Sequence, residues 1–73
     1  MSTLVPERLK ECRTKKKVTH REAAEFLGVT LGTYQRYESG IREPSLAVLY
    51  KIADYYAVSV DWLLGRSESS QQH

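Results

Sequence analysis

The sequence has few of the residues that build covalently linked or metal-bound scaffolds. Its 73 residues include one cysteine, Cys12, and two histidines, so an internal disulfide is excluded and no structural zinc set is expected. No apolar run approaches the roughly 18 residues of a membrane span, and the first residues lack the charged-then-apolar order of a signal peptide. We therefore expect a cytoplasmic protein that uses no metal or cofactor, and we find no sign of a small-molecule ligand or a membrane partner.

The charge is small overall but unevenly distributed. The net charge is +2, yet residues 1–21 contain seven Lys and Arg against two acidic residues, and residues 22–73 contain four against seven. A block such as Lys15–Lys17 more often hydrates a surface than binds a partner. The asymmetry alone does not establish a polyanionic partner.

The amino-terminal third of the chain predicts two helices. Apolar residues at Val5, Leu9 and Cys12 form the stripe of an amphipathic helix, which we expect to run to about Lys16. The stretch 19–22 has the form of a capping box, a threonine followed three residues later by a glutamate, so a second helix should begin there and run to about residue 27.

A short turn should separate this helix from the next. Gly28 suits the left-handed end of a helix, and Thr30 offers a new cap two residues later. The third helix should end at Gly40. The two helices are thus expected to be joined by a turn of about three residues.

Two further helices complete the expected fold. Ser45 should cap a helix over about residues 46–56, and Ser59 a last short helix that ends at Gly65. No strand pattern is present. We predict an all-α domain of five helices over residues 1–65, followed by a disordered polar tail over residues 66–73, which has nothing to bury.

The third helix should have two unlike faces. On a helical wheel, Tyr34 and Tyr37 fall on one side, which we expect to be buried. The opposite side is small and polar, and a glycine within a helix costs about 1 kcal/mol relative to alanine. This arrangement indicates a helix-turn-helix, whose second helix enters the major groove of DNA. The residues of the outer side are Gly32, Gln35, Arg36 and Ser39, with Leu31 and Thr33 on the flanks.

The surrounding sequence closely resembles the Cro/cI-type (XRE) helix-turn-helix family of phage and bacterial transcriptional regulators. The resemblance covers about residues 7–65 and is most specific in the Gly-Val-Thr turn, in "YESG", in "REPS" and in "VDWLLG". It implies the compact five-helix fold of lambda-repressor-like DNA-binding domains. Two positions depart from the expected pattern: Ala57 stands where glycine or asparagine usually ends a helix, and Phe26 lies at an outer position, where we expect local packing.

The resemblance also implies roles for individual residues. Arg13 and Glu38 match a pair that locks the third helix against the body of the domain. Arg36 is the strongest expected reader of a base edge, because it can bond guanine through two acceptors. The other expected base-reading residues are Leu31, Gly32 and Gln35, and the expected phosphate contacts are Thr19, His20, Thr33, Ser39 and Arg42.

We therefore expect a sequence-specific, double-stranded DNA-binding transcriptional regulator that occupies an operator as a repressor and is a homodimer. An enzyme is not expected, because Cys12 and His20 lie on different predicted helices and no phosphate loop or paired-carboxylate cleft is visible. The alternative is a protein-interaction module of the same fold, such as an antitoxin or an adaptor, which Leu31 and Gly32 would favour. The predicted dimer surface consists of Tyr50, Tyr55, Tyr56 and Trp62.

Overall fold

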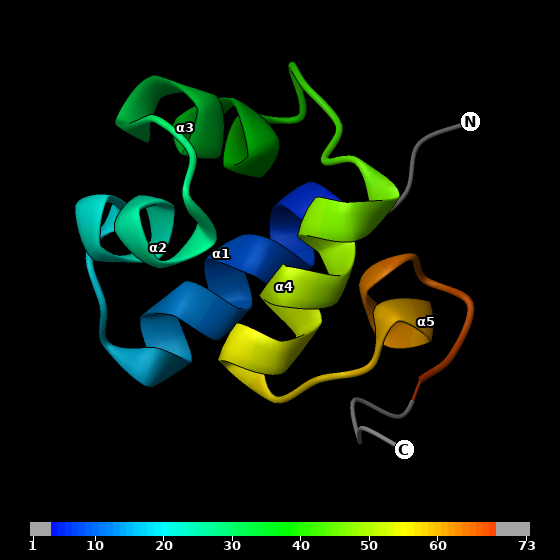
Figure 1. Cartoon of the computed structure of the whole chain (residues 1–73). Coiled ribbons are helices and arrows are strands. Elements are labelled where there is room, and N and C mark those ends of the chain that lie inside the picture. Colours follow the sequence, from blue (N-terminus) through cyan, green and yellow to red (C-terminus); the bar gives the residue numbers. More distant parts are fainter. Residues whose placement is uncertain (1–3, 69–73) are drawn as a thin grey trace.

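The computed structural model describes residues 4–68 and contains five helices, with no strand in that range. Figure 1 shows α1 and α4 crossing at the centre, with α2 and α3 together on one side and α5 on the other. The five-helix, all-α architecture agrees with the expectation. The helices are α1 (Val5–Lys16), α2 (His20–Leu27), α3 (Leu31–Ser39), α4 (Leu46–Tyr56) and α5 (Val60–Leu63).

Hydroxyl caps fix where four of the helices begin. At Thr19 both halves of the capping box form: its hydroxyl accepts from the Glu22 amide at 3.0 Å, and the Glu22 carboxylate accepts from the Thr19 amide at 2.9 Å. The hydroxyls of Thr30, Ser45 and Ser59 each accept from the amide three residues later. Each such cap contributes about 1 kcal/mol, and the predicted caps are confirmed.

One core joins all five helices. It contains fifteen buried apolar or aromatic residues, among them the whole predicted stripe of α1. Helix α3 packs against both α1 and α2, because Tyr34 and Tyr37 point inward with 0% and 4% of their surface exposed. The inward tyrosines thereby turn the other side of α3 to the outside. The largest fully buried side chains are Tyr34, Leu9, Leu27, Ile52 and Leu63.

Two of the four aromatic residues predicted for a dimer surface belong to this core. Tyr56 is 9% exposed, and its hydroxyl shares a hydrogen bond of 2.6 Å with that of Tyr34. Trp62 is 8% exposed, and the Arg8 guanidinium lies 4.6 Å from the centre of its ring. The prediction was wrong for Tyr56 and Trp62, because both are already covered within one chain.

The end of α4 has an unusual backbone. Ala57 adopts the left-handed conformation, with φ 56° and ψ 46°, and its amide bonds to the carbonyls of Ala53 and Asp54. This is the conformation for which glycine is normally used, because the Cβ of other residues crowds the carbonyl oxygen. Ala57 therefore ends α4 in a backbone conformation that is strained for a residue other than glycine.

Arg8 extends the folded body beyond the predicted boundary at Gly65. Its Nη1 donates to the carbonyl of Trp62 and, at 3.2 Å, to the carbonyl of Ser67, and Glu68 lies within 3.9 Å of the guanidinium. The carbonyl of Ser67 is therefore bonded to α1, whereas Arg66 and Glu68 are exposed. The rest of the predicted disordered tail, residues 69–73, lies outside the described residues.

Candidate nucleic-acid interface

The turn between α2 and α3 has the geometry predicted for it. Gly28 ends α2 with φ 74°, and the amide of Val29 bonds to the carbonyl of Ala24 at 3.1 Å. Thr30 then starts α3 with an extended backbone. The two helices are therefore joined by three residues, Gly28 to Thr30, and both pack against the same core.

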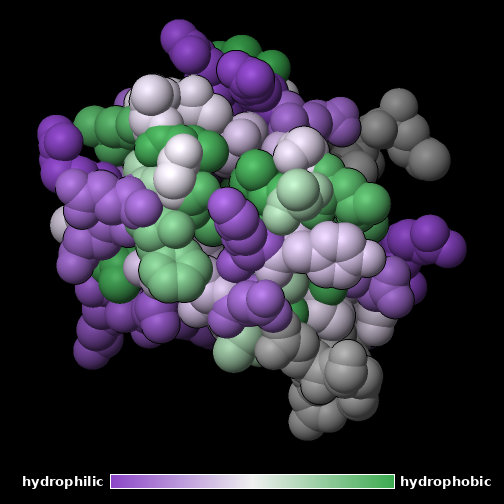
Figure 2. All heavy atoms as spheres, viewed as in Figure 1, coloured by the Kyte–Doolittle hydropathy of each residue, from purple (hydrophilic) through white to green (hydrophobic). Residues whose placement is uncertain are grey.

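The outer side of α3 is polar and largely open. Gly32, Gln35, Arg36 and Ser39 are all exposed, whereas Leu31 and Thr33 are partly buried. Pale, weakly polar side chains lie over α3 in the space-filling view (Figure 2). A merely solvated helix usually shows long charged residues on such a face, and here Arg36 is the one charged side chain among these six.

Gly32 leaves open space at the start of this outer face. A Cβ atom built on it would meet no other atom within 4 Å, and its backbone is helical. Packing within the protein therefore does not require a glycine here. The residue leaves the backbone of the first turn accessible to anything that approaches α3 closely.

The hydroxyls predicted to contact phosphates differ in whether their hydrogen is already donated within the protein. Those of Thr19 and Thr33 accept hydrogen bonds, from the Glu22 amide and from the Thr30 hydroxyl, so each keeps its own hydrogen to donate. Ser39 instead donates to the carbonyl of Arg36 at 3.1 Å. Ser39 would have to exchange this bond in order to donate to a phosphate.

The remaining two predicted phosphate contacts carry or can acquire positive charge. Arg42 is exposed in the loop between α3 and α4. His20 is the first residue of α2, where backbone amides point outward and favour an anion. The structure thus places Thr19 and His20 at the start of α2, Thr33 and Ser39 on α3, and Arg42 in the following loop.

An ion pair anchors the end of α3 to α1. Arg13 Nε donates to Glu38 Oε2 at 2.8 Å, and the exposed fractions of the two side chains are 16% and 7%. The hydrogen bond to Glu38 raises the pKa of Arg13 above its usual range. The other guanidinium contact, from Nη1 to the Val18 carbonyl at 3.4 Å, ties the pair to the segment before α2.

One contact of this pair was missed by sequence reasoning. His20 Nε2 lies 3.4 Å from the second carboxylate oxygen of Glu38. The two residues are eighteen positions apart on different helices, so no periodicity within one helix could have revealed the contact. Only the packing of α2 on α3 brings them together.

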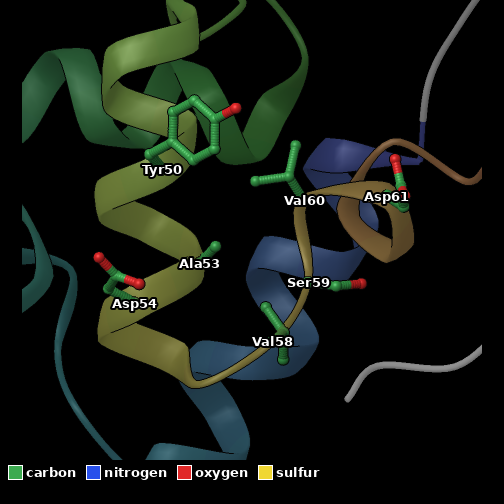
Figure 3. A pocket seen from close by; sticks show the side chains of 7 residues that line it. All are labelled: Tyr50, Ala53, Asp54, Val58, Ser59, Val60 and Asp61. Atoms are coloured by element: carbon green, nitrogen blue, oxygen red, sulfur yellow. The ribbon is translucent and has the colours of Figure 1, made fainter. Parts of the chain in front are cut away.

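Tyr50 and Tyr55 retain the surface that the dimer prediction requires. Tyr50 is 58% exposed and, as Figure 3 shows, lies across a groove from Val60 with Ala53 between them. Tyr55 is partly buried because Phe26 stacks on it, with ring centres 4.3 Å apart. Phe26 is therefore engaged in the local packing expected of it, although it remains 60% exposed.

A second exposed apolar group went unnoticed in the sequence. Ile41 and Leu46 are 78% and 61% exposed, and hydrophobic side chains gather over the start of α4 at the upper right of Figure 2. This group adjoins the loop that contains Arg42.

Within residues 4–68, no helix is long and apolar enough to cross a membrane. Across the same residues, no cluster of histidine, cysteine, aspartate and glutamate could hold a metal ion. The polar residues predicted to contact DNA lie on α2, α3 and the loop after α3, apart from Thr19, which caps α2. The two helices α2 and α3, joined by the three-residue turn from Gly28 to Thr30, define the domain as a helix-turn-helix.

Comparison with known proteins agrees with this class. Residues 9–63 match the family described as "Helix-turn-helix", which is about three quarters of the chain. The chain belongs to that family. A relative from Bacillus subtilis, an SPbeta prophage-derived HTH-type transcriptional regulator called YonR, is 47% identical over 80% of this chain and 54% of its own length.

Two other relatives extend the picture. The cryptic phage CTXphi transcriptional repressor RstR of Vibrio cholerae is 39% identical over 85% of this chain and 55% of its own length. The crystal structure of a transcriptional regulator from Listeria innocua superposes with a TM-score of 0.84 and 25% identity, covering 100% of this chain and 68% of that one. The chain spans about half the length of the curated relatives it matches.

Proposed function

We propose that this protein is a DNA-binding transcriptional regulator of the Cro/cI type that represses by occupying an operator. The observation that carries the proposal is the outer side of α3, which is open, weakly polar and free of acidic residues between Leu31 and Tyr37. The names of the relatives, among them a phage repressor, support the same function. They are regulators, so they give no support to a catalytic role.

The proposed complex places α3 in the major groove. Arg36 is exposed near the middle of this helix and reads guanine through its two acceptors. The side-chain amide of Gln35 can bond adenine, and Leu31 contacts a thymine methyl group. Gly32 has no side chain, so the DNA can approach the helix backbone closely at this position. Few direct base contacts are available, so sequence preference depends also on DNA shape.

Phosphate contacts flank this helix in the proposed complex. The start of α2 supplies Thr19 and His20, and the far end supplies Ser39 and Arg42, with Thr33 between them. Donors on both sides of α3 would fix its depth and register in the groove without reading sequence. The cytoplasm, where the chromosome of a bacterium lies, is the proposed location.

The proposed assembly is a homodimer on two half-sites about 34–36 Å apart. Its support is the exposed position of Tyr50, which is 58% exposed beside the groove of Figure 3. Tyr55 contributes its accessible edge. Light scattering that shows only monomers, both free and on DNA, would contradict this part of the proposal.

Titration of a fluorescent random duplex at low and moderate salt tests DNA binding itself. The logarithm of the binding constant should fall linearly with the logarithm of the salt concentration, with a slope of about −0.9 for each phosphate neutralised. Arg42→Ala should bind less tightly with a shallower slope, whereas Lys51→Ala, an exposed change on α4, should match the wild type. Absence of binding at low salt would favour a protein-interaction module.

Selection of sites from a random duplex pool then tests specificity. The selected sequences should contain two inverted half-sites separated by one helical turn. Recovery of unrelated sequences by a protein that binds duplexes tightly would contradict an operator-specific repressor.

A further inference from the structure

The carboxylate of Glu38 is satisfied at one oxygen and not at the other. Oε2 accepts the hydrogen bond from Arg13 Nε, whereas Oε1 is buried and accepts no hydrogen bond within residues 4–68. The side chain as a whole is 7% exposed. A buried charged oxygen without a donor costs free energy until a donor reaches it.

His20 is the group that faces this oxygen. Its Nε2 lies 3.4 Å from Glu38 Oε1, and its ring meets the edge of the Tyr34 ring at 6.2 Å between centres. The hydroxyl of Tyr34 shares a hydrogen bond with that of Tyr56, and its approach to the Glu38 carboxylate adds to the causes that raise the pKa of Tyr34. The titratable groups in contact with the imidazole are therefore Glu38 and Tyr34 from α3, and Arg13 from α1 is bonded to the other oxygen of Glu38.

The protonation state of His20 decides how many hydrogen bonds its ring can donate. A neutral imidazole has one N–H, so it can donate either to Glu38 or outward, whereas an imidazolium donates from both ring nitrogens. His20 is 39% exposed at the first position of α2. Its ring therefore reaches from the buried carboxylate to the surface on which an anion would lie.

We propose that His20 is a positioning residue that takes up a proton when DNA binds. In the complex its imidazolium donates from Nε2 to Glu38 Oε1 and from Nδ1 to a backbone phosphate. The imidazolium then lies between two negative groups, the Glu38 carboxylate and the DNA phosphate. Because the phosphate is present only when DNA is bound, DNA binding and protonation of His20 favour each other. This inference rests on the proposed DNA-binding function and adds its regulation by pH.

The coupling has a direction that an experiment can read. Histidine is the side chain that normally changes charge between about pH 5 and pH 8. Protonated protein is the form that completes the bridge, so affinity should fall as the pH rises. A single linked proton limits the slope to at most about one factor of ten per pH unit.

The test compares the wild type with His20→Gln on the same duplex at about pH 6 and pH 8. Glutamine keeps N–H donors at this position but cannot gain a proton. His73→Gln removes the other histidine of the chain and serves as the matched control. We expect the wild type and His73→Gln to bind about tenfold more tightly at the lower pH, a coupling of ordinary size.

The quantity to compare is the change in DNA affinity between the two pH values in each protein. The pH dependence of the wild type alone is not sufficient, because the α-amino group also titrates near neutral pH. His20→Gln should lose most of the tenfold change, and thermal melting should confirm that it is folded at both pH values. Equal pH dependence in the wild type and His20→Gln would overturn the inference while leaving DNA binding intact. Failure of the wild type to bind any duplex at any pH would refute the proposed function and the inference together.

Discussion

Arg13 on α1 donates through Nε to Oε2 of Glu38, the penultimate residue of α3, over 2.8 Å. The two residues are 25 positions apart, and both side chains are largely shielded from water. The bond therefore fixes the end of α3 relative to the first helix. Since α3 carries the outward polar face, its angle to the rest of the domain depends on this contact.

Glu38→Ala should destabilise the domain strongly. It leaves the Arg13 guanidinium without its carboxylate, and removal of one partner of a buried pair costs up to about 3–5 kcal/mol, less here because Arg13 keeps some contact with water. Thermal and urea melts measure the loss. Glu25→Ala, at an exposed position of α2, is the control and should change little. Equal melts for the two variants would contradict the anchoring role.

Gly32→Ala separates helix stability from DNA binding. The substitution meets no atom within 4 Å, so it should stabilise the free protein by about 1 kcal/mol through better helix propensity. We expect weaker DNA binding, because a methyl group would occupy the open space at the start of α3. Gly28→Ala is the contrasting change, since φ 74° strains any residue with a Cβ, and it should lower stability. Unchanged or tighter DNA binding by Gly32→Ala would mean that the glycine is tolerated rather than needed.

Arg36 should contribute specificity rather than general affinity. Its loss is expected to cost about 1–3 kcal/mol on a selected site and to relax the choice of base at one position of each half-site. Arg36→Lys keeps the charge but not the two-pronged geometry, so it should bind random duplexes like the wild type and still lose discrimination. Competition between the selected site and versions altered one base pair at a time measures both effects. A uniform loss over all of these sites would assign Arg36 to the phosphates.

The sequence was sufficient to predict those features that depend on residues close to each other in the chain. The caps at Thr19, Thr30, Ser45 and Ser59, and the turn at Gly28, depend on residues within one helical turn of each other, and the structure confirms them. The inward direction of the α3 tyrosines followed from periodicity alone. For these features, adjacent residues contain the information.

Contacts between distant parts of the chain were beyond this reasoning. An aromatic residue near the end of a helix can face a partner or the core, and only the packing of α4 and α5 shows that Tyr56 and Trp62 face the core. The hold of Arg8 on Ser67 spans 59 residues. The approach of His20 to Glu38 depends in the same way on how α2 lies on α3.

Ala57→Gly should stabilise the protein. A non-glycine residue in the left-handed region costs about 1–2 kcal/mol, and the loss of chain entropy with glycine offsets part of the gain, so we expect a net increase of about 0.5–1 kcal/mol. Ala47→Gly, an exposed change within α4, should instead destabilise by about 1 kcal/mol. Denaturant midpoints compare the two. A decrease for Ala57→Gly would show that the left-handed conformation imposes no strain there.

Stability should fall on the alkaline side because the core buries groups that must stay protonated. Burial raises the pKa of the Cys12 thiol to about 11 and that of Tyr56 to about 12, and it raises the pKa of Tyr34 as well. Above the ordinary thiol pKa of about 8.5, the unfolded chain binds fewer protons than the folded one, so the free energy of unfolding decreases with pH. The loss should begin near pH 9 and continue through pH 12, deepening as the tyrosines of the unfolded chain ionise near pH 10.

Urea titrations at fixed pH values from 7 to 11 measure this dependence. Tyr56→Phe removes one ionisable group and the 2.6 Å bond to Tyr34, so it should be less stable at neutral pH but lose less stability per pH unit above 10, where free tyrosine ionises. Tyr50→Phe is the matched control, because Tyr50 is 58% exposed. Its alkaline slope should equal that of the wild type. If Tyr56→Phe and Tyr50→Phe gave the same slope, the alkaline loss would have to come from Cys12 and Tyr34, and Cys12→Ala should then remove only the part that is due to the thiol.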